Sequence, residues 1–170
     1  MGPEDTGMHL FNHDASPEEA IITGFGLEMG LRDFYISMKS KVKSAEAVEL
    51  FEKLADIEIL HEKQLVELYA KLVSKTLTLD EFQEKIVQPT MEGRLTTDQY
   101  MQRYDFDMES ELDILSLAMA IEVQALDLYL RAVDSSKASA AREVLHHIAD
   151  EERSHIVMLG QRVEQLKELV

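Results

Sequence analysis

The chain has 170 residues, of which 45% are hydrophobic and 29% charged, a composition typical of one soluble domain with its own core. It has no cysteine, which excludes disulfides, thiolate metal sites and a rubredoxin-type iron centre. The formal net charge of −16 argues against nucleic acid and anionic membranes as partners, because both require clustered lysine and arginine. No run of roughly 18 apolar residues predicts a membrane span, and the chain begins without signal-peptide features, so we expect a cytoplasmic protein.

The first helix is expected to begin after a polar stretch. Residues 1–15 are mixed in character and predict an N-terminal arm. Ser16 followed by Pro17 is a typical helix start, with serine as the N-cap and proline in the first turn. In the helix that follows, large side chains recur every three or four positions and form one stripe, whose single carboxylate is Glu28.

A second helix is expected from near Ser44. Its apolar stripe, spaced alternately by three and four residues, has two polar members at its middle, Glu58 and His61. Two residues three positions apart lie on one helical face and on adjacent turns, so both side chains can reach one metal ion. The first two helices predict a hairpin over about residues 17–74.

Residues 75–108 break the helical pattern. Within them, Thr78 and Thr96 each begin a sequence that resembles the capping box of a short helix. The segment is too long for a tight turn and predicts a crossover that runs the length of a helical bundle. A hinge that lets the two halves swap between chains is the alternative.

The second half of the chain predicts another hairpin, over about residues 108–168. Its first helix is expected over about residues 108–133, with Glu122 as the carboxylate in its stripe. Its second helix is expected to start near Ser135 or Ser136 and to run close to the C-terminus. We therefore expect residues 16–170 to form a single domain.

The two halves repeat each other at an offset of 94 residues. Glu152 and His155 form a second Glu-x-x-His pair at this offset from Glu58 and His61. Other identities repeat at the same offset: Glu28 and Glu122, Asp33 and Asp127, Tyr35 and Tyr129, Asp56 and Asp150, and Leu65 and Leu159. The sequence predicts an all-α fold, a four-helix bundle of two helical hairpins joined by a long crossover.

Four acids and two histidines would meet if the four stripes face one another, namely Glu28, Glu58, His61, Glu122, Glu152 and His155. A buried unpaired carboxylate costs about several kcal/mol, and four together repel one another. The stripes contain no lysine or arginine to pair with them. Two divalent cations would balance the four carboxylates. This is the ligand set of ferritin-like di-iron and di-manganese bundles, and zinc would also bind.

Three further side chains are candidates for hydrogen bonds to these ligands. Tyr35 and Tyr129 lie two turns after the lone glutamates; each either bonds a metal-bound carboxylate, acts in a radical relay, or is a core aromatic whose hydroxyl finds another partner. Glu151 occupies the position before Glu152 and can hold the opposite imidazole, whereas Ile57 occupies the equivalent position and cannot.

The other acids and histidines near these motifs fall outside the stripes. Asp56 and Asp150 are two residues away from the stripes, so we expect them to be exposed. We also expect the remaining histidines to lie on the surface: His9, His13, His146 and His147.

With these motifs the chain resembles the rubrerythrin branch of the ferritin-like superfamily, over about residues 17–168. The motifs that carry the resemblance are Glu28 with Tyr35, the segment from Leu54 to His61, Ile121-Glu122 with Tyr129, and the segment from Ile148 to His155. The resemblance implies a non-haem di-iron site that reduces hydrogen peroxide to water or handles dioxygen, in a homodimer that could be hairpin-swapped. It implies that the four glutamates act through the two irons, with the two histidines as further ligands.

The chain departs from full-length rubrerythrins in two ways. Their cysteine-rich rubredoxin-like domain feeds electrons to the iron site, and this chain has no cysteine, so the expected electron donor is a separate rubredoxin-like protein. They also carry a glutamate three residues after the third-helix ligand, where this chain has Ala125. Two alternatives therefore stay open: a ferroxidase or iron-binding protein without significant peroxidase turnover, and a non-catalytic structural bundle.

Overall fold

The computed structural model describes residues 17–73, 78–84, 102 and 109–169. Every regular element in these ranges is a helix, which confirms the predicted all-α class. The helices are α2 (Pro17–Lys39), α3 (Ala45–Leu72), α4 (Leu79–Gln83), α6 (Glu111–Ser135) and α7 (Ser139–Glu168). None of these five helices has the length and apolar character needed to cross a membrane.

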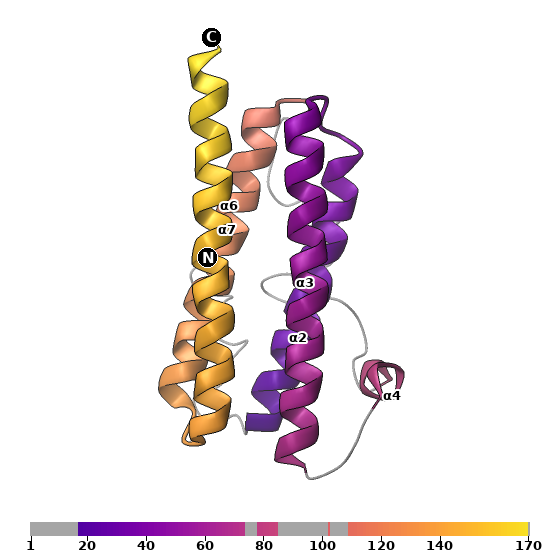
Figure 1. The fold of residues 1–170 in the computed structure, drawn as a ribbon, viewed down its shortest axis with the longest axis vertical. Helices are drawn as coiled ribbons and strands as arrows, with labels where there is room; N and C mark the ends of the chain where they lie inside the picture. Colours follow the sequence, from indigo (N-terminus) through magenta and orange to yellow (C-terminus); the bar gives the residue numbers. More distant parts are fainter. Residues whose placement is uncertain (1–16, 74–77, 85–101, 103–108, 170) are drawn as a thin grey trace.

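The four long helices form two hairpins that lie side by side (Figure 1). Helix α2 packs along α3, and α6 packs along α7. Between the hairpins, α3 contacts α7 and α2 contacts α6. The predicted bundle of two helical hairpins is therefore confirmed. Most of the predicted crossover lies outside the described residues, as does the capping box at Thr96.

Serine residues are the N-caps of two of the long helices, α3 and α6. The hydroxyl oxygen of Ser44 accepts a hydrogen bond from the backbone N–H of Ala47 at 3.2 Å, and Ser110 accepts one from Asp113 at 3.2 Å. Each bond satisfies an N–H group in the first turn that has no partner within the helix. The predicted start near Ser44 is confirmed, whereas the third helix begins slightly later than residue 108 because Ser110 is its cap.

The start of the fourth helix was predicted wrongly, by about one turn. Helix α6 continues through Ser135, whose hydroxyl donates to the carbonyl of Ala132 at 3.2 Å and does not cap a new helix. The N–H of Ser136 also bonds to Ala132 and closes α6. Helix α7 then begins at Ser139, without a side-chain cap.

The short helix α4 covers one part of the first hairpin. Its capping box at Thr78 and Glu81 forms as predicted. The buried ring of Phe82 packs against Phe25 and against Tyr69, with ring centroids 4.9 Å apart in both cases. Figure 1 shows α4 outside the four long helices, next to α3.

A buried arginine ties the two hairpins together at one end of the bundle. Arg162 of α7 donates from Nε and Nη2 to Glu111 of α6, at 3.0 and 2.9 Å. Its Nη2 also donates to the hydroxyl of Ser44, the cap of α3, at 3.0 Å. One guanidinium group therefore joins three helices.

Candidate metal centre

The six acids and histidines singled out from the sequence are all buried at the centre of the bundle. They form two overlapping groups, in each of which the nearest ligand atoms all lie within 4.8 Å of one another. The groups are Glu28, Glu58, His61 and Glu152, and Glu58, Glu122, Glu152 and His155. Glu58 and Glu152 belong to both groups, so the two groups are adjacent and have these two glutamates in common.

Both imidazoles turn their Nδ1 atoms toward the acids. His61 Nδ1 lies 3.0 Å from Glu28 Oε2 and 3.0 Å from Glu58 Oε2. His155 Nδ1 lies 3.2 Å from Glu122 Oε1 and 3.4 Å from Glu58 Oε1. The two rings are nearly parallel, with centroids 5.7 Å apart and an interplanar angle of 19°. The repeat in the sequence thus becomes an approximate two-fold symmetry of the site.

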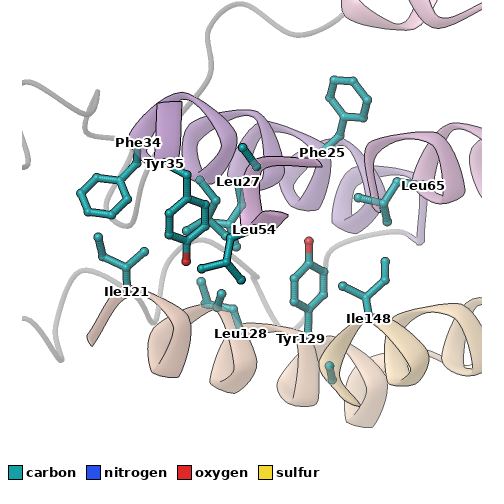
Figure 2. Packing of buried hydrophobic residues seen from close by; sticks show 14 of the residues in the cluster. Phe25, Leu27, Phe34, Tyr35, Leu54, Leu65, Ile121, Leu128, Tyr129 and Ile148 are labelled. Atoms are coloured by element: carbon teal, nitrogen blue, oxygen red, sulfur yellow. The ribbon is translucent and has the colours of Figure 1, made fainter. Parts of the chain in front are cut away.

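The two tyrosines hold acids that belong to the opposite hairpin. The Tyr35 hydroxyl donates to Glu122 Oε1, and the Tyr129 hydroxyl donates to Glu28 Oε1. Figure 2 shows both hydroxyl groups pointing into the space between the hairpins. Each tyrosine hydroxyl therefore forms a hydrogen bond to a carboxylate of the candidate site, which was one of the alternatives given above.

Gly24 makes room for one of these tyrosines. A Cβ atom at this position would lie 3.3 Å from the hydroxyl oxygen of Tyr129 and 3.5 Å from Leu65. The first distance is tighter than an ordinary van der Waals contact, so a larger residue would displace the Tyr129 ring.

The outer nitrogens of the two imidazoles have different surroundings. His61 Nε2 lies 2.7 Å from Glu151 Oε2, so Glu151 holds the imidazole of the opposite hairpin as predicted. The Nε2 atom of His155 is buried and has no hydrogen-bond partner within the described ranges. Ile57, the counterpart of Glu151, cannot provide one.

Without a metal, two of the glutamates favour their protonated forms. Burial raises the pKa of the Glu28 carboxyl well above its usual range, and the nearby charge of Glu58 raises it further. Burial likewise raises the pKa of the Glu122 carboxyl, with a further rise from Glu152. Both acids would otherwise place a negative charge in an apolar interior.

The two histidines hold protons more strongly than usual. Burial alone lowers the pKa of His155, but its interactions with Glu122 and Glu152 outweigh burial and raise the pKa to about 11. The pKa of His61 is raised for the same reason, because Glu152, Glu28 and Glu58 outweigh the effect of burial. Glu152 differs from Glu28 and Glu122: burial raises its pKa, but Glu122 and the two histidines lower it below the usual range.

Several acceptor atoms at the centre, most of them near an imidazole, make no hydrogen bond to any described residue. These buried oxygens, which lack a hydrogen-bond partner in the part of the chain that is described, are Glu58 Oε1, Glu122 Oε2 and both carboxylate oxygens of Glu152. Buried carboxylate oxygens without partners are costly unless they bind cations. Four acids and two neutral imidazoles match the charge of two dications, and their oxygen and nitrogen atoms are suitable ligands. The buried Glu and His groups could therefore hold metal ions.

The sequence did not indicate a fifth buried acid, which lies next to His61 on α3. Glu62 follows His61 on α3, is 1% exposed, and accepts from Arg32 Nη1 of α2 at 2.6 and 2.9 Å. Neither residue lies in the predicted stripes, and their counterparts 94 residues later are the uncharged Ile156 and Leu126. No pattern in the sequence places the two side chains opposite each other.

The remaining predictions near the site concern its surface. Asp56, Asp150, His146 and His147 are exposed, as predicted. His9 and His13 lie outside the described residues.

The chain was also compared with known proteins. No model of a protein family matches it, and no curated protein matches it. Its structure is similar to that of a hypothetical protein from Pyrococcus furiosus, with a TM-score of 0.69 and 25% sequence identity, over 92% of this chain and 93% of that one.

Proposed function

We propose that this chain is a non-haem di-iron oxidoreductase that reduces hydrogen peroxide to water, like the rubrerythrins that its sequence resembles. The observation that carries the proposal is the buried set of four glutamates and two histidines, drawn from all four long helices. In a bundle that served only as a scaffold, several buried carboxylate oxygens without a hydrogen bond to the described residues would lower stability.

The two groups of side chains suggest which residues hold each ion. Glu28 and His61 would bind one iron, and Glu122 and His155 the other. Glu58 and Glu152 belong to both groups, so we assign them to both irons. Iron or manganese suits mixed carboxylate and imidazole ligands; zinc fits the same set but cannot exchange electrons.

Reduction of hydrogen peroxide requires two electrons and two protons and yields two water molecules. A pair of bound iron(II) ions would supply the two electrons. The apolar side chains around the site keep bulk water out, which limits side reactions. Tyr35 and Tyr129 keep protons at their hydroxyl groups and hold Glu122 and Glu28 in place. Because the chain has no cysteine, the electrons would return from a separate rubredoxin-like donor.

One observation favours a second candidate, a ferroxidase or iron-binding protein. Ala125 is buried on α6, three residues after Glu122, where rubrerythrins carry a further glutamate. An alanine at this place cannot take part in the binding or movement of iron. The protein would then oxidise iron(II) with dioxygen and would turn over peroxide slowly.

Stopped-flow oxidation of the iron-loaded protein separates these candidates. The anaerobic protein, with two iron(II) ions per chain, is mixed with hydrogen peroxide or with dioxygen, and the appearance of iron(III) is followed by absorbance. We expect faster oxidation by peroxide, with about one peroxide consumed for each pair of irons, the two-electron stoichiometry of a two-ion site. Faster oxidation by dioxygen, continuing well beyond two irons per chain, would support the ferroxidase.

A histidine pair on α7 provides the control. His155→Ala removes a proposed ligand and should abolish the fast oxidation, whereas His146→Ala removes an exposed imidazole from the same helix and should leave it unchanged.

Thermal unfolding with zinc and with a chelator tests the structural alternative. Binding of two ions, each at about 100 times its dissociation constant, adds about 5 kcal/mol of stability. If neither zinc nor chelator changes the melting temperature, the metal centre is refuted.

A further inference from the structure

The two candidate metal positions are alike on their inner sides and different on their outer sides. Toward the centre, His61 Nδ1 lies 3.0 Å from Glu28 and His155 Nδ1 lies 3.2 Å from Glu122. Away from the centre, His61 Nε2 lies 2.7 Å from Glu151 Oε2. The corresponding nitrogen of His155 is buried and has no partner among the residues placed by the structure.

The difference between the outer sides of the two histidines corresponds to a difference between residues 57 and 151 of the repeat. Residues 57 and 151 are 94 positions apart and each directly precedes a Glu-x-x-His motif. Position 151 carries a carboxylate, whereas position 57 carries isoleucine, which has no acceptor atom. His155 is only 1% exposed, so bulk water does not take the place of the missing acceptor.

An acceptor at the outer nitrogen matters for metal binding. When Nδ1 of an imidazole binds a metal, the proton of the neutral ring is on Nε2. A carboxylate that accepts a hydrogen bond from this N–H group fixes the tautomer, orients the ring and makes Nδ1 more basic. Loss of such a partner typically lowers metal affinity about 10- to 100-fold.

We infer that the two metal positions are unequal and fill in order. This inference rests on the proposed metal centre and adds to it the roles of residues 57 and 151. The position with Glu28 and His61 takes the first ion, because Glu151 supports its imidazole. The position with Glu122 and His155 takes the second ion, about 10 to 100 times more weakly. Glu151 is thus a positioning residue, which acts on the metal through His61.

The test exchanges residues 57 and 151. Four chains are compared: the natural sequence, Glu151→Ile, Ile57→Glu, and the double exchange. Zinc is the probe because it has no redox chemistry, and calorimetry against a competing chelator gives the two affinities. Long-range proton–nitrogen NMR spectra of the ¹⁵N-histidine-labelled protein, taken at one zinc per chain, show which Nδ1 atom binds first.

Each chain has its own expected result. The natural protein binds two zinc ions with affinities that differ about 10- to 100-fold, and the His61 Nδ1 signal shifts first. Glu151→Ile should leave two similar, weak positions, and Ile57→Glu two similar, tight ones. The double exchange should reverse the order, so that His155 binds first.

Two further variants guard against indirect effects. Ile59→Glu adds the same charge next to Glu58 at another partly buried position, and it should leave the order of filling unchanged. Glu151→Gln keeps an acceptor for His61 without the charge; it should weaken the first position less than Glu151→Ile, and it replaces that variant if Glu151→Ile does not fold.

Two outcomes would overturn the inference. One is equal affinity at the two positions of the natural protein, and the other is an unchanged order of filling in the double exchange. These outcomes differ from failure of the proposed metal centre, in which the natural protein would bind no zinc at the six buried residues and no histidine Nδ1 signal of His61 or His155 would shift.

Discussion

At the scale of single residues, Tyr35 and Tyr129 each fix a carboxylate of the opposite hairpin. Both tyrosines and both acceptors, Glu122 and Glu28, are fully buried. A carboxylate that lost its tyrosine would therefore find no water to replace the hydroxyl. Each hydroxyl thus contributes both to the geometry of the site and to the contact between the hairpins.

Removal of either hydroxyl should destabilise the protein. We expect Tyr35→Phe and Tyr129→Phe each to lower the free energy of unfolding by about 1–3 kcal/mol, because each removes a hydrogen bond to a buried carboxylate that water cannot replace. Urea denaturation of the metal-free protein measures the change. Ser116→Ala, which removes an exposed hydroxyl from α6, is the control and should change stability by less than about 0.5 kcal/mol. Equal effects of all three variants would contradict the prediction.

The sequence indicated these tyrosines through their spacing but did not identify their partners. A separation of seven residues places Tyr35 two turns from Glu28 on one helical face. The acid that the hydroxyl reaches is Glu122, 87 positions away, because the hairpins face each other across the site. The same limitation hid the contact between Arg32 and Glu62, since helical periodicity does not say how one helix is rotated against another.

At the scale of helices, Arg162 is the main polar contact between α7 and the ends of α6 and α3. Its guanidinium is buried, with a side chain 9% exposed, and Glu111 is 17% exposed. Arg162 also donates to the hydroxyl of Ser44, which is the N-cap of α3, so its guanidinium contacts the first turn of this helix. Removal of one partner from a buried ion pair costs more stability than removal of one partner from a surface pair, because the other charge stays buried.

Replacement of this arginine should weaken the bundle more than replacement of an exposed one. We expect Arg162→Met to lower the free energy of unfolding by about 1–3 kcal/mol, because it leaves the Glu111 carboxylate half-buried without a partner. Arg131→Met is the matched control: it breaks an exposed pair with Asp127 on α6 and should cost less than about 0.5 kcal/mol. Chemical denaturation measures both, and a similar loss for the two variants would refute the role given to Arg162.

The boundaries of the helices were predictable where a side chain closes the first turn. Ser44 follows a short break and its hydroxyl accepts from Ala47, as a serine N-cap does. Ser135 and Ser136 gave the same signal in the sequence, but α6 continues through Ser135. Serine can also bond to the carbonyl of an earlier turn, as Ser135 does with Ala132, so serine alone does not distinguish the end of one helix from the start of the next.

At the scale of the whole molecule, the metal-free protein holds extra protons at its centre. The pKa of His155 is about 11 in the folded chain, against about 6.5 when the chain is unfolded. His61 has a raised pKa as well. Bound metal ions would displace these protons, because a coordinated Nδ1 atom must be free of its proton.

The stability of the metal-free protein should therefore fall as the pH rises. Between pH of about 6.5 and 11 the folded chain holds a proton on His155 that the unfolded chain has lost. The stabilisation by this proton is complete below a pH of about 6.5 and is lost as the pH rises toward about 11. The loss is up to about 1.4 kcal/mol per pH unit for each such proton. The raised pKa values of Glu28 and Glu122 act in the same direction.

Urea denaturation at pH 7, 8 and 9, with and without zinc, measures this effect. The metal-free protein should lose stability across the series, whereas the zinc-loaded protein should change much less, because its ligands no longer titrate. His146→Ala removes an exposed histidine and should not alter the slope. A flat profile without zinc would show that the buried histidines hold no extra protons.

The approximate two-fold symmetry of the centre has a consequence for its origin. Each group of ligands takes side chains from both halves of the chain, and each half offers one glutamate, one tyrosine and one Glu-x-x-His pair. Two identical copies of an ancestral hairpin, meeting as a dimer, would be enough to enclose the same pair of ions. Such a dimer would have to carry the same residue on both sides. Once the copies are joined in one polypeptide, either can mutate alone, so the two halves are free to differ as they do at Ile57 and Glu151.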